Sequence, residues 1–291
     1  MIAFTKMHGI GNDFVMVNGF GLDHDRIDWP HLARQTCDRS FGVGADGLIL
    51  AMPGNADVPF RMRMWNPDGS ESEMCGNGIR CFAEFLHQEG LTVDDRIPVL
   101  TGAGQLELQR LPGSQVRVNM GRARLLRGEI GMTGPEDETF VNQPVESFSP
   151  ALQGTAVSMG NPHLVMFVES IASVPLENWG PRLEHHPLFP QRVNVHFVEA
   201  VSPHHLRQLT WERGAGRTLA CGTGACACAV AAILNQKAQS PVEIDLPGGR
   251  LTIEVDADLQ VWMTGPAATV FTGSWRIHDH QSASPSLAMN R

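Results

Sequence analysis

The sequence predicts an α+β protein made of two homologous halves, and a repeated cysteine motif is the first reason. Cys-Gly-Asn-Gly begins at Cys75, and Cys-Gly-Thr-Gly begins at Cys221, 146 residues later (221 − 75). A tryptophan precedes each cysteine by the same interval. Gly-Asn-Asp-Phe at 11–14 has a counterpart in Gly-Asn-Pro-His at 160–163, 149 residues later (160 − 11). Three matches in the same order indicate that the whole chain is duplicated.

Length and composition fit two soluble domains. The chain has 291 residues, which exceeds the usual size of one domain. Hydrophobic residues make up 42% and charged residues 18%, as in a globular protein with a sizeable core. A net charge of −9 without a Lys and Arg cluster argues against a nucleic-acid partner. No apolar run reaches the roughly 18 residues of a membrane span, and no secretory signal is recognisable, so we expect a cytoplasmic location.

In both halves the sequence pattern predicts several strands, then one helix, then further strands. In the first half, strand patterns occur at 14–18, 47–51, 60–65, 105–111 and 115–120. Helical spacing follows Cys75 and stops at Gly90. In the second half, strand patterns occur at 156–159, 164–168, 193–201, 205–211, 242–246 and 251–256. The helix after Cys221 is small and apolar on every side, so we expect it to be buried inside its domain.

The two cysteine motifs predict a two-base proton transfer. A helix N-terminus offers unpaired N–H groups and a positive dipole end, which favour a thiolate and bind anions. Glycines let another molecule approach the backbone. Two such cysteines facing across a cleft can remove a proton from one face of a carbon and deliver one to the other. That chemistry is racemisation or epimerisation, and the helix ends would stabilise the charge that develops.

Other roles for the cysteines and other cofactors are less well supported. We expect a disulfide framework or a zinc site to be absent, and we interpret Cys37, Cys81, Cys226 and Cys228 as buried or incidental. A pyridoxal phosphate enzyme needs a Schiff-base lysine, but the two lysines, Lys6 and Lys237, stand in no phosphate-binding context. We therefore expect chemistry without cofactor or metal.

Four segments resemble the diaminopimelate epimerase family closely: KMHGIGNDF, WNPDGSESEMCGNGIRCF, SMGNPH and ERGAGRTLACGTGAC. The resemblance runs in order from Lys6 to about Gly273. It implies two pseudo-symmetric domains, each a strand-rich, barrel-like sheet around a central helix, with the active site in the cleft between them. The N-terminal half would span 1–120 and be completed by a strand near 264–277. The C-terminal half would span 121–263, and residues 278–291 would form a frayed tail.

The resemblance also implies roles for individual residues. Cys75 would abstract the proton of LL-2,6-diaminopimelate and Cys221 would donate the new one, giving the meso isomer for lysine and peptidoglycan synthesis. Residues expected to bind the zwitterionic substrate are Asn12, Asn66, Gly76, Asn77, Asn161, Asn194, Glu212, Arg213, Gly222 and Thr223. His163 and Glu212 would tune the cysteines. The family implies a homodimer. Gly47 replaces the Gln of some relatives, so position 47 is left out of the site.

Two alternatives remain open. A proline racemase or hydroxyproline epimerase shares the fold and the cysteine pair, but those enzymes resemble Cys-Gly-His-Gly at the first motif and need no clamp such as Glu212–Arg213 for a far amino acid group. The phenazine-biosynthesis isomerases lack the paired cysteines. From a different class, a thiol redox or binding protein would use a Cys75–Cys221 disulfide, which we expect only as an inactivating side reaction.

Overall fold

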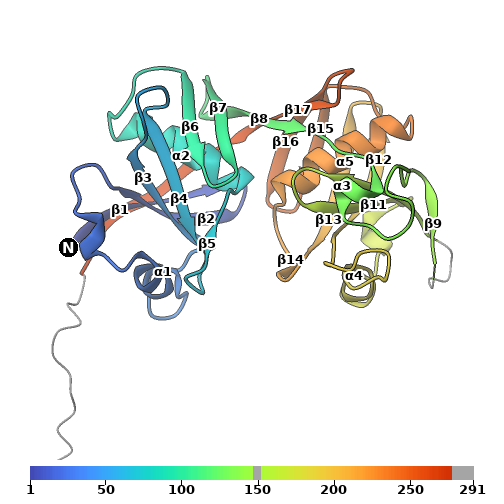
Figure 1. Ribbon diagram of the computed structural model, residues 1–291, viewed down its shortest axis with the longest axis horizontal. Coiled ribbons are helices and arrows are strands. Elements are labelled where there is room, and N and C mark those ends of the chain that lie inside the picture. The colour runs from blue at the N-terminus through green and yellow to red at the C-terminus, as the bar shows by residue number, and fades with distance from the viewer. Residues whose placement is uncertain (147–151, 277–291) are drawn as a thin grey trace, which may run out of the picture.

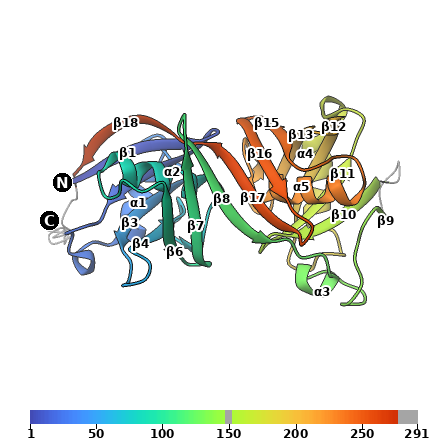
Figure 2. The same cartoon turned by 90° about the horizontal axis from the view of Figure 1, so that it is seen from above.

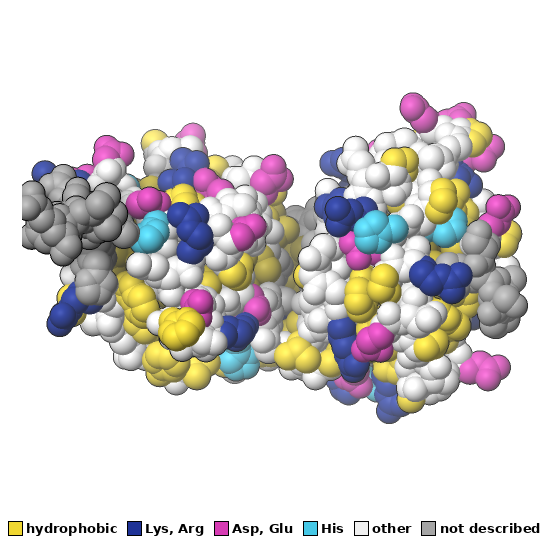
Figure 3. All heavy atoms as spheres, turned by 90° about the horizontal axis from the view of Figure 1, so that it is seen from below, with side chains coloured by type: hydrophobic (Ala, Val, Ile, Leu, Met, Phe, Trp, Pro, Cys, Tyr) yellow, Lys and Arg dark blue, Asp and Glu magenta, His cyan; other side chains and the backbone are white. Residues whose placement is uncertain are grey.

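The computed structural model describes residues 1–146 and 152–276, which form two lobes joined by long strands (Figure 1). The predicted tail at 278–291 lies outside the described residues. None of the helices in the described part of the chain has the length and apolar composition needed to cross a membrane. On the face seen in Figure 3, a groove separates the lobes, and charged side chains of both signs are scattered over each lobe.

The first lobe is built mainly from the N-terminal half of the chain. Its strands are β1 (Ile2–Gly9), β2 (Asn12–Asn18), β3 (Gly47–Pro53), β4 (Phe60–Trp65), β5 (Glu71–Ser72), β6 (Arg96–Thr101), β7 (Gly104–Leu111) and β8 (Gln115–Arg122). Its helices are η1 (His24–Arg26), α1 (Trp29–Cys37) and α2 (Gly76–Gln88). The α2 helix ends two residues before Gly90, whose φ of +68° a helix cannot continue.

The second lobe repeats the series. Its strands are β9 (Gln143–Val145), β10 (Leu152–Ser158), β11 (Pro162–Phe167), β12 (Asn194–Ser202), β13 (His205–Glu212), β14 (Gly216–Arg217), β15 (Val242–Leu246), β16 (Gly249–Val255) and β17 (Gln260–Pro266). Its helices are α3 (Arg127–Ile130), η2 (Ile171–Ser173), α4 (Leu176–Glu184) and α5 (Gly222–Leu234). The last strand, β18 (Ala268–Trp275), belongs to the first lobe.

Strand pairing repeats as well. In the first lobe β1 pairs antiparallel with β2, and β2 pairs parallel with β3; in the second lobe β10, β11 and β12 pair in the same way. The parallel pair of β4 with β6 likewise matches that of β13 with β15. The predicted duplication is therefore visible as one topology used twice.

Two features tie the halves together. Strands β8 and β17 pair antiparallel between the lobes, from Gln260 opposite Arg122 to Pro266 opposite Gln115. The chain then returns to the first lobe, where β18 pairs with β1 (Figure 2). The first lobe thus takes its last strand from the C-terminal half of the chain. The boundaries predicted for the two domains stay a prediction.

One helix is enclosed in each lobe. Ten residues of α5 are buried because its many small residues, Ala, Cys and Gly, allow close packing against strands on all sides. The α2 helix buries its first eleven residues, Gly76 to Leu86. Both helices belong to one hydrophobic cluster that also includes Met263 of β17, whereas α1 and α4 cover the outside of the lobes. The predicted α+β fold of two pseudo-symmetric, barrel-like domains around central helices is confirmed.

Candidate active site

A cleft of about 1500 Å³ lies between the lobes. Its walls come from both halves, and the N-termini of α2 and α5 meet there. The Cβ of a side chain at Gly76 would lie only 3.7 Å from the Cα of Gly222, so the two helix ends almost touch. These glycines therefore leave backbone N–H groups of both helices open to the same point in the cleft.

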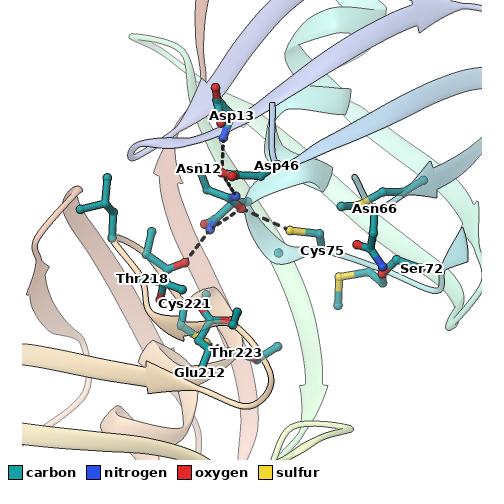
Figure 4. A pocket seen from close by; sticks show the side chains of 18 of the residues that line it. Asn12, Asp13, Asp46, Asn66, Ser72, Cys75, Glu212, Thr218, Cys221 and Thr223 are labelled. Carbon is teal, nitrogen blue, oxygen red and sulfur yellow. Dashed lines mark hydrogen bonds between the residues drawn. The ribbon is translucent and has the colours of Figure 1, made fainter. Parts of the chain in front are cut away.

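Cys75 and Cys221 are the N-cap residues of the two helices, in extended backbone conformation. The sequence places them there because a cysteine followed by Gly-x-Gly starts each helix with no bulky side chain over its first turn. Figure 4 shows them on opposite sides of the cleft, each from its own lobe. This is the geometry that proton transfer to the two faces of one carbon requires.

The two thiols differ in their surroundings. Burial raises the pKa of Cys75, while the backbone N–H groups at the start of α2 act in the opposite direction. Burial raises the pKa of Cys221 well above its usual range, and the Glu212 carboxylate raises it further. Cys75 keeps a partly exposed face, whereas Cys221 is only 5% exposed. Cys221 is therefore the thiol that is harder to ionise.

A network of amide groups surrounds Cys75. Its sulfur lies 3.6 Å from Asn12 Oδ1, to which the thiol can donate. Asn77 Nδ2 donates to the same oxygen at 3.1 Å and to the Ala220 carbonyl at 3.2 Å, which joins the two lobes beside the cleft. Asn12 Nδ2 donates to Asp46 Oδ2 at 2.6 Å, so the Asn12 oxygen faces the sulfur (Figure 4).

Charged groups hold this wall of the cleft. Burial alone would raise the pKa of Asp13, but hydrogen bonds from Arg39 and Lys6 bring it down to about 2. Arg39 also donates to Asp46 Oδ1 at 2.7 Å. Asp13 is thus fixed as a carboxylate. Asp46, held by Arg39, in turn orients Asn12.

Two buried histidines lie behind the wall of the cleft that the second lobe forms. His163 Nδ1 and His196 Nε2 are 2.9 Å apart. Burial lowers the pKa of His163 well below its usual value and that of His196 to about 3, so both rings are neutral near pH 7. Thr210 Oγ1 donates to His196 Nδ1 and itself accepts from Gln208 Nε2. His196 therefore donates to His163, whose remaining N–H donates to Asn161 Oδ1 at 2.9 Å.

The hydrogen bonds continue from Asn161 to Cys221, the predicted catalytic cysteine of the second lobe. Asn161 Nδ2 donates to Thr223 Oγ1 at 3.4 Å. The Thr223 hydroxyl lies 3.8 Å from the sulfur of Cys221 and can donate to it. Every donor from Gln208 onward thus points toward Cys221, which favours the thiolate once a proton has left.

The wall of the cleft expected to bind the far end of the substrate carries one acidic residue, Glu212, and one basic residue, Arg213. Burial raises the pKa of Glu212, which accepts a hydrogen bond from Thr218 Oγ1. Arg213 lines the cleft and donates one guanidinium hydrogen bond to the Gln191 carbonyl. The side-chain oxygen of Asn194 accepts a hydrogen bond from the backbone N–H of Arg213 at 3.0 Å.

Most of the predicted residues come together in the cleft. Those that line it are Asn12, Asn66, Cys75, Gly76, Asn77, Asn161, Glu212, Arg213, Cys221, Gly222 and Thr223. His163 and Asn194 lie behind the wall and reach the cleft through Asn161 and Arg213. Their predicted roles toward substrate stay predictions.

Several residues of the site escape sequence reasoning. Asp46, Thr218 and Ser72 line the cleft, and His196 supports it from behind. Asp46 stands in a plain Gly-Ala-Asp-Gly turn, and His196 stands in a strand. Their partners are 33 or 34 residues away in the chain, at His163 and Asn12, so no local spacing signals them. In the part of the chain that the structure describes, no three His, Cys, Asp or Glu side chains are grouped to hold a metal ion.

Comparison with known structures gives the same fold. A PhzF-family phenazine biosynthesis protein of Bacillus anthracis superposes with a TM-score of 0.70 at 17% identity, over 95% of this chain and 99% of that one. A hydroxyproline epimerase of Agrobacterium vitis superposes with a TM-score of 0.67 at 14% identity, over 94% and 91% of the chains.

Sequence comparison is more specific. Diaminopimelate epimerase 1 of Nostoc sp. is 50% identical over 276 residues, which are 94% of this chain and 99% of the relative. Diaminopimelate epimerase of Pelotomaculum thermopropionicum is 48% identical, over 94% and 98% of the two chains. The family model for diaminopimelate epimerase matches residues 4–126 and 155–270. With both cysteine-capped helices inside the matched regions, the chain belongs to the diaminopimelate epimerase family.

Proposed function

We propose that this protein is an isomerase that interconverts LL- and meso-2,6-diaminopimelate for lysine and peptidoglycan synthesis. The observation that carries the proposal is the meeting of two cysteine-capped helix N-termini, one from each lobe, at a single cleft. Relatives of 47–50% identity that span nearly the whole chain carry the name of that enzyme.

The reaction needs two bases with opposite protonation. For the LL substrate, the Cys75 thiolate removes the α-proton, and the Cys221 thiol delivers a proton to the opposite face of the same carbon. Cys75 is then a thiol and Cys221 a thiolate, which is the arrangement that the reverse reaction needs. After this transfer the Cys75 thiol can donate to Asn12 Oδ1, and the Cys221 thiolate can accept from the Thr223 hydroxyl.

The N-termini of α2 and α5 would make the α-carbon of the substrate acidic enough to lose its proton to a thiolate. Loss of the α-proton moves negative charge onto the neighbouring carboxylate, and the backbone N–H groups at Gly76, Asn77, Gly222 and Thr223 would receive it. The far amino acid group would be held by Arg213, whose planar fork suits a carboxylate, together with Glu212, Asn66, Asn161 and Asn194. Glu212 also raises the pKa of Cys221 and so keeps it as the thiol.

Proline racemase chemistry is the nearest alternative. A hydroxyproline epimerase shares the fold, but at 14% identity this likeness extends to the fold alone. The Glu212–Arg213 pair supports the longer substrate, because a compact ring has no far group to engage it. A cytoplasmic location and a homodimer remain part of this proposal.

Solvent deuterium incorporation tests the function directly. LL-diaminopimelate and DL-proline are incubated separately in ²H₂O, under reducing conditions, with the intact chain and with Cys75→Ser, Cys221→Ser and Cys37→Ser. Cys37 is buried in α1 outside the cleft and is the matched control. We expect α-deuterium and meso product from diaminopimelate, lost by about 10²- to 10⁴-fold in either cleft variant and kept in the control.

The other outcomes are equally informative. Exchange with proline alone would keep the two-thiol mechanism and replace the substrate. Absence of exchange with both amino acids would overturn the isomerase and leave the cysteine pair to a redox or binding role. An activity that oxidant leaves unchanged would exclude a Cys75–Cys221 disulfide as an inactivating side reaction.

A further inference from the structure

A buried guanidinium lies beneath the first turn of α2 without a carboxylate. Arg80 is 0% exposed. Its Nη1 donates to the Gly76 carbonyl at 2.9 Å, and its Nε donates to the Pro266 carbonyl at 3.3 Å. Among residues 1–146 and 152–276 no Asp or Glu pairs with it, whereas Arg110, a partly buried arginine that also reaches α2, pairs with Glu84. A buried charge without a counter-ion is costly, so its presence requires a reason.

The structure builds a space for this guanidinium out of glycines. A Cβ at Gly9 of β1 would lie 2.9 Å from its Nη2, and a Cβ at Gly265 of β17 would lie 3.1 Å from its Nε. Only residues without a side chain fit at these two positions. The guanidinium is therefore enclosed by α2, by the first strand and by a strand that crosses between the lobes.

The charge of Arg80 adds to two others of the same sign. The positive ends of α2 and α5 meet in the cleft directly above it. The thiols of Cys81 and Cys226 also face Arg80, but burial raises the pKa of each to about 12, so both stay neutral near pH 7. The groups that can carry negative charge at this point are Cys75, the Glu212 carboxylate of the opposite lobe and a bound carboxylate. Burial raises the pKa of Cys75 most, and the Glu212 carboxylate raises it further, whereas the N–H groups of α2 and the Arg80 charge lower it. The counter-charge of Arg80 thus arises when Cys75 ionises or when an acidic substrate enters.

Arg80 also determines how one amide points. Its Nη2 donates to Asn77 Oδ1 at 2.9 Å, so Asn77 Nδ2 must face the other way. That Nδ2 donates to Asn12 Oδ1 and to the carbonyl of Ala220, the residue before Cys221. One guanidinium therefore sets a contact that connects Cys75, through Asn12, with the mouth of the opposite helix.

We propose that Arg80 is a positioning residue of the epimerisation: its buried charge favours the thiolate of Cys75, and its bond to Asn77 fixes the contact between the two helix mouths. The inference deepens the proposed function and rests on it only for the role of Cys75 as a base. A purely structural role for Arg80 makes a different prediction, because it would affect folding and leave the ionisation of Cys75 unchanged.

The experiment measures Cys75 itself and needs no substrate. In a Cys221→Ser background, the rate of iodoacetamide alkylation at Cys75 is followed against pH, with peptide mass spectrometry to assign the labelled cysteine. We expect Arg80→Met and Arg80→Gln to raise the pH of half-maximal alkylation by about one unit or more. Arg80→Lys keeps the charge and should stay near the unsubstituted arginine.

Arg110→Met is the matched control. It removes an arginine that contacts the same helix but is paired with Glu84, so we expect a lower thermal midpoint and an unchanged Cys75 titration. Epimerisation by the Arg80→Met chain that retains both cysteines should lose kcat, with its acid limb moved upward in pH. If the neutral variants left the Cys75 titration in place, or if Lys moved it as far as Gln, the proposal would be wrong. Because alkylation is independent of diaminopimelate, neither result depends on the identity of the substrate.

Discussion

The two helix mouths have the same shape but different linings. In the first lobe, the glycine at the third helical position, Gly78, packs against Ile49 and Phe14, with Cys75 beside it. In the second lobe, Gly224 packs against His196 and the sulfur of Cys221. Ile49 and His196 are the third residues of the equivalent strands β3 and β12. An apolar lining in one lobe thus corresponds to a polar one in the other.

The charges near the two cysteines differ in the same way. Arg80 occupies the position in α2 that Cys226 occupies in α5, five residues after each cap. Asn66 precedes Cys75 by the same interval at which Glu212 precedes Cys221. Arg80 therefore acts on Cys75 and not on Cys221, whereas the Glu212 carboxylate raises the pKa of both thiols and is second only to burial at Cys221. Duplication thus supplied two equivalent helix mouths, and substitutions around them placed a buried cation, Arg80, at the first and a carboxylate, Glu212, at the second.

The largest expected effect comes from adding a methyl group to the mouth of α5, compared with the same change at the mouth of α2. In Gly224→Ala the new Cβ would lie 2.3 Å from Cε1 of His196, a ring held by hydrogen bonds on both sides, and 2.9 Å from the Cys221 sulfur. We expect about a 100-fold loss of kcat and about 1–3 kcal/mol of lost stability. In Gly78→Ala the Cβ meets the flexible end of Ile49 at 2.7 Å, which can rotate away.

Steady-state epimerisation and urea unfolding of the two variants check this prediction. Gly78→Ala should lose less than about tenfold in kcat, because only a methyl group has to move. Equal losses in the two variants would show that the linings are equivalent despite their chemistry.

A smaller effect is expected from removing the anion of the second lobe. Glu212→Gln takes away a carboxylate that raises the pKa of Cys221. The pH of half-maximal alkylation at Cys221, measured in a Cys75→Ser background, should therefore fall. Epimerisation in the chain with both cysteines should drop by about tenfold, the change that one pKa unit represents. An unchanged Cys221 titration would remove Glu212 from the comparison.

The smallest effect concerns stability against acid. The pKa of His196 is about 3 in the folded protein and near 6.5 when unfolded, so its contribution is present above pH 6.5 and lost as the pH falls toward 3. At pH 5 the loss is about 2 kcal/mol. His196→Gln keeps an amide donor for His163 and should reduce by about that amount the fall in unfolding free energy between pH 7 and pH 5. His87→Gln, in the last turn of α2, is the control and should leave the fall unchanged.

The sequence was sufficient for the duplication, the central helices and the two cysteines, because each leaves a local signal. The Cys-Gly-x-Gly repeats encode both the cap and the close approach of the backbone, and the apolar periodicity after them encodes burial. Only one residue of the histidine pair could be predicted as part of the site. His163 stands in the segment SMGNPH, which resembles the family, whereas nothing in the sequence distinguishes His196 from other strand residues. Arg80 stood within a quoted motif, but its lack of a carboxylate partner depends on β1 and β17, which lie far away in the chain.

The return of β18 to β1 constrains how this molecule can be made. Ile2 lies opposite Trp275, so the edge of β1 has no partner until nearly the whole chain has left the ribosome. An unpaired strand edge is a template for pairing with other chains, and contacts of such sequence separation form slowly. The N-terminal lobe therefore cannot complete its folding during synthesis, although it is translated first. Its exposed β1 edge is the point at which a folding chain is most open to aggregation and at which a chaperone would protect it.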